Sequence, residues 1–182
     1  VSVNENQTTV DTFTANETVT WSLNGGADAS KFNINSSNGT LSFSSAPDFE
    51  NPSDANSGND YVVIVRATDS ASNTSDQTVT VSVTDLDDTN PLITGNSGGA
   101  GSSTSSVSVN ENQTTVDTFT ANETVTWSLN GGADASKFNI NSSSGALSFS
   151  SAPDFENPSD ANSGNDYVVI VRATDSASNT SD

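Results

Sequence analysis

The chain has very few basic residues, and it has no cysteine, histidine or methionine at all. Of its 182 residues, 23 are aspartate or glutamate and only 4 are lysine or arginine, which gives a formal net charge of −19. Nucleic-acid binding needs a surface rich in lysine and arginine, and this chain cannot provide one. The absence of cysteine and histidine excludes disulfide scaffolds, structural zinc sites, and catalysis by Cys–His or Ser–His–Asp groups.

Long hydrophobic runs are also absent. The longest aliphatic run, residues 62–65, is far too short to span a membrane. The first residues, Val1-Ser2-Val3, lead straight into polar sequence, so we expect no signal peptide in this chain. A hydrophobic content of 31% with strong negative charge is typical of disorder. The apolar residues alternate in short runs, however, and this indicates a thin β core in one or two domains.

The sequence is an internal repeat. Residues 107–182 match residues 1–76 except at two positions, where Asn38 becomes Ser144 and Thr40 becomes Ala146. So close a match indicates recent duplication, and the identity therefore does not mark the residues that matter. Because residues 77–106 have no second copy, we expect the chain to be a slice of a tandem array that begins and ends within a unit.

Seven short segments of one repeat have the alternation and composition of β-strands. They are residues 1–3, 8–14, 19–23, 32–34, 41–43, 61–68 and 77–83. Asn38-Gly39 favours a hairpin turn, and residues 27–31 are compatible with one helical turn. The pattern predicts an all-β fold of tandem seven-stranded Greek-key β-sandwich domains, with the aromatic side chains in the core.

The acidic residues cluster where the predicted strands end. In a sandwich of this topology the loops after alternate strands gather at one pole, so we expect six carboxylates to meet there, with Asp69 at the opposite pole. The six are Glu5, Asp48, Glu50, Asp85, Asp87 and Asp88. Such a group repels itself unless a cation neutralises it, and ligands that offer only oxygen suit Ca²⁺. The alternative is a solvated acidic surface that keeps the protein soluble.

Four short motifs resemble those of the cadherin-like calcium-binding repeats of large bacterial surface proteins. Asn4-Glu5-Asn6 resembles the x-Glu-Asn motif, Asp48-Phe49-Glu50 the Asp-x-Glu motif, and Ala67-Thr68-Asp69 the Ala-x-Asp motif. Residues 85–91 resemble the interdomain signature Asp-x-Asn-Asp-Asn-x-Pro, although Asp87 and Thr89 replace its two asparagines. The likeness covers essentially the whole chain in two copies.

The resemblance implies Ca²⁺ as the cofactor, bound at a junction between two repeats. The ligands that it implies are Glu5, Asp48, Glu50, Asp85, Asp87 and Asp88 from the first repeat, and Asp175 with Asn122 or Glu123 from the second. The Asp-x-Asp motif that usually follows the second strand is absent, so the third of the three usual cations is in doubt. Glu111, Asp154 and Glu156 repeat the first three ligands without the acidic run, and we expect their site to be incomplete.

Two positions for the domain boundary compete. Composition favours a flexible linker over the Gly- and Ser-rich residues 92–106. The resemblance instead places domain 1 at residues 1–90 and domain 2 at residues 91–182, with residues 91–94 as an opening strand. Domain 1 then lacks its opening strand and domain 2 its closing strand. Residues 167–174 become an unpaired apolar edge, open to a following segment or to a strand of another chain.

The function that the resemblance implies is structural. The chain is expected to be a calcium-rigidified repeat of a long bacterial cell-surface or secreted protein, extracellular, that acts as an extension stalk or in cell adhesion and biofilm formation. Its partners would be neighbouring repeats, with other surface proteins or glycans left open. The alternatives are a carbohydrate or homophilic binding module, and a strand-exchanging subunit of an extracellular fibre. We expect no enzyme: a glycosidase using Asp48 and Glu50 would need a cleft-forming insertion.

Overall fold

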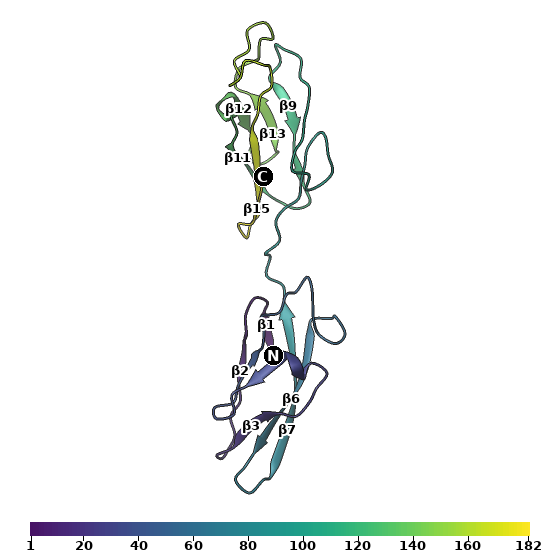
Figure 1. Ribbon diagram of the computed structural model, residues 1–182, viewed down its shortest axis with the longest axis vertical. Helices are drawn as coiled ribbons and strands as arrows, with labels where there is room; N and C mark the ends of the chain where they lie inside the picture. Colours follow the sequence, from purple (N-terminus) through teal and green to yellow (C-terminus); the bar gives the residue numbers. More distant parts are fainter. The chain divides into compact units, whose positions relative to one another are not determined.

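The computed structural model describes residues 1–182, and its regular structure is β throughout, apart from two single 3₁₀ turns. The chain forms two compact units, Val1–Leu86 (unit 1) and Asp87–Asp182 (unit 2) (Figure 1). The sequence analysis places the boundary between residues 90 and 91. No helix has the length and hydrophobicity of a membrane-spanning segment.

Unit 1 contains seven strands in the predicted order. They are β1 (Ser2–Asn4), β2 (Thr9–Thr12), β3 (Thr20–Leu23), β4 (Phe32–Ile34), β5 (Thr40–Phe43), β6 (Asp60–Thr68) and β7 (Thr74–Thr84). The expected helical turn is the 3₁₀ helix η1 (Ala29–Lys31). The all-β prediction is therefore confirmed.

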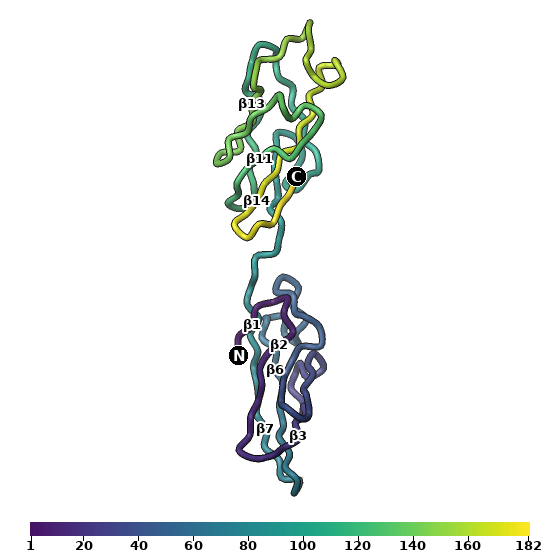
Figure 2. The backbone as a smooth tube through the Cα atoms, turned by 90° about the vertical axis from the view of Figure 1, so that its left-hand side faces the viewer, coloured from purple at the N-terminus to yellow at the C-terminus, as the bar shows by residue number.

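The strands of unit 1 form two sheets, with the orders β1-β7-β6-β3 and β2-β5-β4. Strand β1 lies parallel beside β7, and the other neighbours are antiparallel (Figure 2). Alternate residues of β6 and of the second half of β7 point inward, which buries Tyr61, Val63 and Val65 from β6 and three valines from β7. These residues pack with Phe32, Leu41 and Phe43 of the other sheet in one core, so the unit is a β-sandwich.

A local turn sets the hairpin between β4 and β5. The Asn35 side chain accepts hydrogen bonds from the backbone N–H groups of Ser37 and Asn38, at 3.0 and 3.2 Å. Gly39 has a φ of +72°, and a Cβ there would lie 2.6 Å from the Phe13 carbonyl oxygen. The glycine of the predicted Asn-Gly turn is therefore required both by its backbone conformation and by the space available.

Unit 2 repeats this plan, but the counterparts of β6 and β7 are shorter. They are β8 (Ile93–Thr94), β9 (Thr115–Thr118), β10 (Thr120–Ala121), β11 (Thr126–Gly131), β12 (Phe138–Ile140), β13 (Ala146–Phe149), β14 (Ile170–Thr174) and β15 (Thr180–Ser181), with the 3₁₀ helix η2 (Ala135–Lys137). Its sheets have the orders β12-β13-β9, β11-β14-β15 and β10-β8. Trp127, Leu147 and Ala173 are among its buried core residues.

The Gly- and Ser-rich residues 92–106 are bonded into unit 2. Strand β8 pairs with β10, and the backbone N–H of Gly101 donates to the carbonyl of Ile93 at 2.8 Å. The backbone N–H of Asn96 donates to the Asp117 carboxylate at 2.9 Å. The opening strand that the resemblance implied for the second repeat is thus present as β8, and the residues after it form turns tied to the same unit.

Candidate metal sites

Three groups of carboxylates are arranged so that a metal ion could bind. Within each group, one oxygen of every member lies within 4.8 Å of the others. The groups are Glu5, Asp48 and Glu50 (group A), Asp87, Glu123 and Asp175 (group B), and Glu111, Asp154 and Glu156 (group C). Groups A and C are the same residues in the two copies of the repeat, so their surroundings can be compared directly.

Group A is built around a buried glutamate. Glu5 follows β1, is 1% exposed, and its backbone N–H donates to the Thr84 carbonyl at the end of β7 at 3.1 Å. Its carboxylate accepts the backbone N–H groups of Phe49 at 2.7 Å and Leu86 at 2.9 Å. These two bonds hold both oxygens in place beside Asp48 and Glu50.

Group C has the same members in a looser setting. Glu111 accepts the backbone N–H of Phe155 at 3.0 Å, as Glu5 accepts that of Phe49. The second bond, from Leu86 in unit 1, has no counterpart because residues 77–106 have no second copy. All three carboxylates of group C are exposed.

Group B joins the start of unit 2 to the end of β14. Asp175 directly follows β14 and is 8% exposed. The Asn179 side chain donates to the Asp175 carboxylate at 2.8 Å and to the Asp87 carbonyl at 3.0 Å. The sequence analysis missed Asn179. The only sequence signal is its spacing from the aspartate, which recurs as Asp69 and Asn73 in unit 1 with an equivalent bond of 2.8 Å.

The electrostatics of group B show how crowded its charges are. Burial raises the pKa of Glu123, and the neighbouring charges of Asp87 and Asp175 raise it further. Burial would also raise the pKa of Asp175, but the hydrogen bonds from the Asn179 side chain and from backbone N–H groups outweigh it and lower that pKa. Group B therefore contains one carboxylate held in its charged form and another whose ionisation its neighbours oppose.

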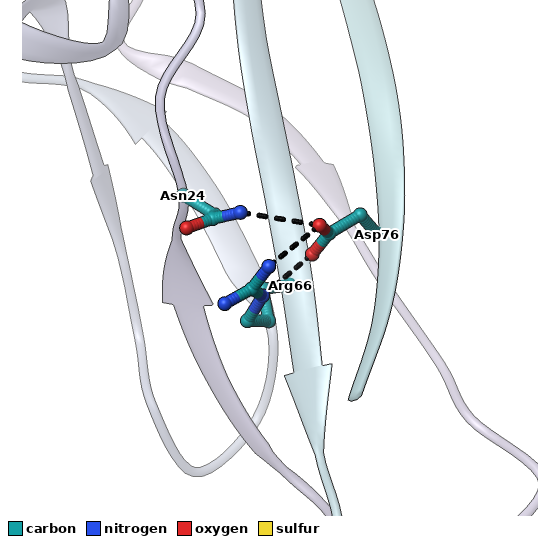
Figure 3. A network of polar contacts seen from close by, with 3 residues as sticks. All are labelled: Asn24, Arg66 and Asp76. Carbon is teal, nitrogen blue, oxygen red and sulfur yellow. Dashed lines mark hydrogen bonds and ion pairs between the residues drawn. The ribbon is translucent and has the colours of Figure 1, made fainter. Parts of the chain in front are cut away.

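The two arginines form ion pairs outside these groups. Arg66 forms a bidentate ion pair with Asp76, and both nitrogen–oxygen distances are 2.7 Å (Figure 3). The Asn24 side chain donates a hydrogen bond to the same carboxylate. Arg172 pairs with Asp182 in the same way. Both ion pairs use aspartates that lie outside groups A, B and C.

The two other predicted carboxylate ligands lie outside these groups. Asp85 and Asp88 are exposed and belong to none of the three. The side-chain oxygen of Asn122 accepts the backbone N–H of Leu92 at 2.6 Å. Asp69 directly follows β6, at the end of the strand where Thr68 pairs with Thr74. Glu5 lies near the opposite end of β6, where Asp60 pairs with Ser82.

Two buried aspartates of unit 1 escaped the sequence analysis, and both act as structural acceptors. Asp28 accepts the backbone N–H groups of Ala55 at 2.7 Å and Val62 at 2.8 Å. Asp54 accepts those of Gly58 and Asn59 at 3.0 and 3.2 Å. The Asn- and Gly-rich sequence after Asp54 is a turn signal that could have identified this loop, whereas Asp28 has no comparable local signal.

All potential metal-ligand atoms in the three groups are carboxylate oxygens, and none is a nitrogen or sulfur atom. This donor set fits a hard cation such as Ca²⁺ and does not fit zinc or copper, which prefer histidine and cysteine. The residues present thus fit the cofactor that the sequence resemblance implied.

Comparison with known proteins identifies the fold. No protein-family profile matches the chain, and no curated protein sequence matches it. A protocadherin gammaB7 structure of domains EC3–6 matches all of this chain and 42% of its own, at 27% identity and a TM-score of 0.54. Human protocadherin-24 EC1–2 matches 88% of this chain and 72% of its own, at 18% identity and a TM-score of 0.53.

Mouse cadherin-23 EC22–24 matches 99% of this chain and 59% of its own, at 20% identity and a TM-score of 0.51. This chain spans less than half the length of the protocadherin gammaB7 structure described above. These likenesses show that the chain has a cadherin-like fold.

Proposed function

We propose that the chain is a calcium-binding, adhesion-type repeat of a long extracellular protein, in which bound calcium stiffens the array. One observation carries this proposal: three groups of three carboxylates are assembled in the structure, and the two arginine ion pairs use aspartates outside them. Maintaining such groups without a cation costs repulsion, and that repulsion grows as the carboxylates lose water.

The proposed ligands fall into two sets. In unit 1 they are the members of group A together with Asp85, and in unit 2 they are the members of group B together with Asp88 and Asn122. Ca²⁺ takes six to eight oxygen ligands in flexible geometry, so waters and carbonyl oxygens would complete each shell. Glu5 is prepared for this role because two backbone N–H bonds already fix its carboxylate.

Stiffening follows from where the chain is tied on either side of the unit boundary. Leu86, the last residue of unit 1, donates its N–H to Glu5, and the Asp87 carbonyl accepts from Asn179. Cations bound by groups A and B would therefore restrain the backbone on both sides of the Leu86–Asp87 peptide bond. Without them, the carboxylates of residues 85–88 repel one another and favour bending.

The proposed setting is the surface of a bacterial cell or a secreted fibre, where the chain serves as an extension stalk or in adhesion. The solved structures with this fold support an extracellular role in which chains associate, since one is described as an extracellular domain and another as a cis-dimer. A sugar-binding role has less support. The aromatic rings pack on one another inside each unit, as Phe32, Phe43 and Tyr61 do in unit 1.

The test is a calcium titration of the whole chain by calorimetry, together with thermal unfolding and solution scattering. We expect calcium to raise the melting temperature and to lengthen the particle, and EGTA to reverse both effects. The double substitution Asp48→Asn with Glu50→Gln should weaken binding while leaving the buried Glu5 in place. Asp11→Asn with Glu17→Gln, which removes two exposed acids outside the groups, is the matched control. The proposal is wrong if calcium changes neither property, or if the control pair weakens binding as much.

A further inference from the structure

One sequence motif distinguishes the two copies of the repeat. An asparagine followed two residues later by serine or threonine, with any residue except proline between them, is the acceptor for N-linked glycosylation. Five such triplets lie in residues 1–76, and four of them recur unchanged in residues 107–182. The triplet without a counterpart is Asn38-Gly39-Thr40, because unit 2 has Ser144-Gly145-Ala146 in its place. The five triplets are residues 6–8, 16–18, 35–37, 38–40 and 73–75.

The two positions at which the copies differ are thus the two that this chemistry requires. Position 38 supplies the carboxamide nitrogen that receives the sugar, and position 40 supplies the hydroxyl that marks the acceptor. The turn itself needs neither residue. Gly39 and Gly145 have φ values of +72° and +69°. The Ser144 hydroxyl accepts the N–H of Ala146 at 3.4 Å, where unit 1 uses the Asn38 carboxamide. Both sequences therefore form the same hairpin, and they differ in what that hairpin presents to solvent.

The Asn38 carboxamide lies at the tip of the hairpin between β4 and β5. Asn38 is exposed, and its Oδ1 accepts the backbone N–H of Thr40 at 3.0 Å. This bond closes a local turn and fixes the orientation of the carboxamide, with Nδ2 left for solvent. The Thr40 hydroxyl is 3.4 Å from the Thr12 hydroxyl, a distance at which a hydrogen bond is weak. Both groups of the triplet are therefore presented on one exposed turn.

Two other triplets of unit 1 use their polar groups within the fold. The Oδ1 of Asn35 accepts the Ser37 hydroxyl at 2.8 Å, so the hydroxyl of this triplet is already bonded to its own asparagine. The Nδ2 of Asn73 donates to the Asp69 carboxylate at 2.8 Å. The two remaining triplets occur in both copies and so cannot distinguish them. The hairpin triplet of unit 1 is thus both accessible and specific to that unit.

We propose that Asn38 is an attachment site for an N-linked sugar, which the hairpin of unit 2 lacks. The co-reactant is a sugar joined through C1 to a nucleoside diphosphate. Nδ2 attacks C1, the bond between Nδ2 and C1 forms, and the bond between C1 and the phosphate oxygen breaks. The electron pair of that bond leaves with the diphosphate, and Nδ2 loses one proton to a base of the transferase. The product is a neutral amide, and nothing is oxidised or reduced.

The sugar would lie at the end of unit 1 that is distant from group A. The N–H of Trp21 donates to the Ser36 carbonyl beside the turn, at 2.9 Å. Trp21 pairs with Ala67, near the end of β6 that Asp69 follows. Two of the group A carboxylates instead follow the other end of β5. Glycosylation of Asn38 should therefore leave the proposed calcium ligands untouched.

The experiment incubates the whole folded chain with a soluble transferase specific for Asn-x-Ser/Thr and with UDP-glucose, in the presence of EGTA so that the result is independent of calcium. Trypsin cleaves after lysine and arginine, which releases residues 32–66 from unit 1 and residues 138–172 from unit 2. Mass spectrometry with electron-transfer fragmentation then locates any added hexose. We expect hexose on Asn38 and none on residues 138–172. Thr40→Ala should abolish the modification without unfolding the hairpin, because unit 2 has alanine at that position.

Exchanging the two differing residues tests whether the triplet itself is the site. Ser144→Asn with Ala146→Thr makes residues 107–182 identical to residues 1–76, and hexose should then appear at position 144. Amide NMR before glycosylation should show the hairpin of each variant folded, since the structure holds that hairpin with both sequences. The proposal fails if Asn38 of the folded chain gains no hexose, if Thr40→Ala is modified as fully, or if the exchanged chain gains none at position 144. It also fails if residues 138–172 of the original chain are modified as much as residues 32–66.

Discussion

The two units contain the same residues at all but two of the repeated positions, and yet a glutamate that is buried in one is exposed in the other. Glu5 is 1% exposed and has two backbone donors, whereas Glu111 is exposed and has one. Local sequence cannot cause this difference, because the local sequence is identical. The partner strand causes it: β7 pairs with both β1 and β6 in unit 1.

Features with short-range causes are the same in both units. The stacked rings of Phe32 and Phe43 lie 4.6 Å apart, and those of Phe138 and Phe149 lie 4.7 Å apart. The hairpin turns use the same asparagine acceptor, Asn35 and Asn141. Neighbouring strands and turns thus fold alike, while pairing across a long sequence separation decides what differs.

Group A depends on that distant pairing. The Glu5 N–H bonds to the Thr84 carbonyl and the Glu5 carboxylate to the Leu86 N–H, so β7 and the residues after it position the glutamate. Calcium binding and closure of the sheet should therefore be coupled in unit 1, and group C should resemble group A only when unit 2 gains an equivalent strand.

The largest effect is expected from making unit 1 resemble unit 2. Val81 is 0% exposed and lies opposite Tyr61 in the centre of the sheet. Val81→Asp buries a carboxylate without a partner, and we expect a loss of about 4 kcal/mol or more in the stability of unit 1. Hydrogen exchange should show β1 and the first half of β6 losing protection, while unit 2 is unchanged. Thr80→Asp, at the exposed neighbouring position, is the control, and retained protection in Val81→Asp would contradict the coupling.

An intermediate effect, equal in both units, is expected from the buried aspartates. Asp28→Ala removes the acceptor of the N–H groups of Ala55 and Val62, and a hydrogen bond to a charged group contributes about 1.5–3 kcal/mol. Asp134→Ala removes bonds of the same lengths, 2.7 and 2.8 Å, in unit 2. Urea unfolding followed by NMR reports each unit separately. A much smaller loss in unit 2 would mean that this loop also depends on β7.

The sequence was sufficient for those parts of the fold that follow from periodicity and composition. Alternating valines located β6 and β7, and Asn38-Gly39 located the hairpin turn. Glu5, Asp48 and Glu50 could be placed together because loops after alternate strands share a pole, and the structure brings these three together. The strand predicted over residues 8–14 was too long, since β2 spans only Thr9–Thr12.

The residues that the sequence could not identify act through partners distant in the chain. Asp28 accepts the N–H of Val62, which is 34 residues away, and Asn179 bonds to Asp87 across 92 residues. A polar side chain has no periodicity that reveals which backbone group it will face. Asp85 and Asp88 were grouped with the other acids from their position after the last strand, and the structure places them in none of the carboxylate groups.

The smallest effect is expected at acid pH, and it tests whether the loop after Asp54 is independent of β7. Burial would raise the pKa of Asp54, but backbone N–H groups of Gly58, Asn59 and Asn56 outweigh it and hold that pKa below its ordinary value of 3.8. The pKa of Asp160 is lowered by the equivalent bonds in unit 2. Because the unfolded chain then binds more protons, each carboxylate stabilises its unit above the ordinary value, and this contribution is lost as the pH falls through the lower folded value.

Asp54→Asn should therefore flatten the decline of the urea midpoint of unit 1 between about pH 5 and about pH 3, and Asp160→Asn should do the same for unit 2. The effect is small because the amide keeps an oxygen acceptor for the same N–H groups. Val83 of β7 donates its N–H to the Asn59 carbonyl at 2.8 Å, and this is the only backbone bond between β7 and that loop. Equal flattening in the two units would show that the Asp54 bonds suffice to hold the loop. A decline that changes only in unit 1 would show that the bond from β7 is needed as well.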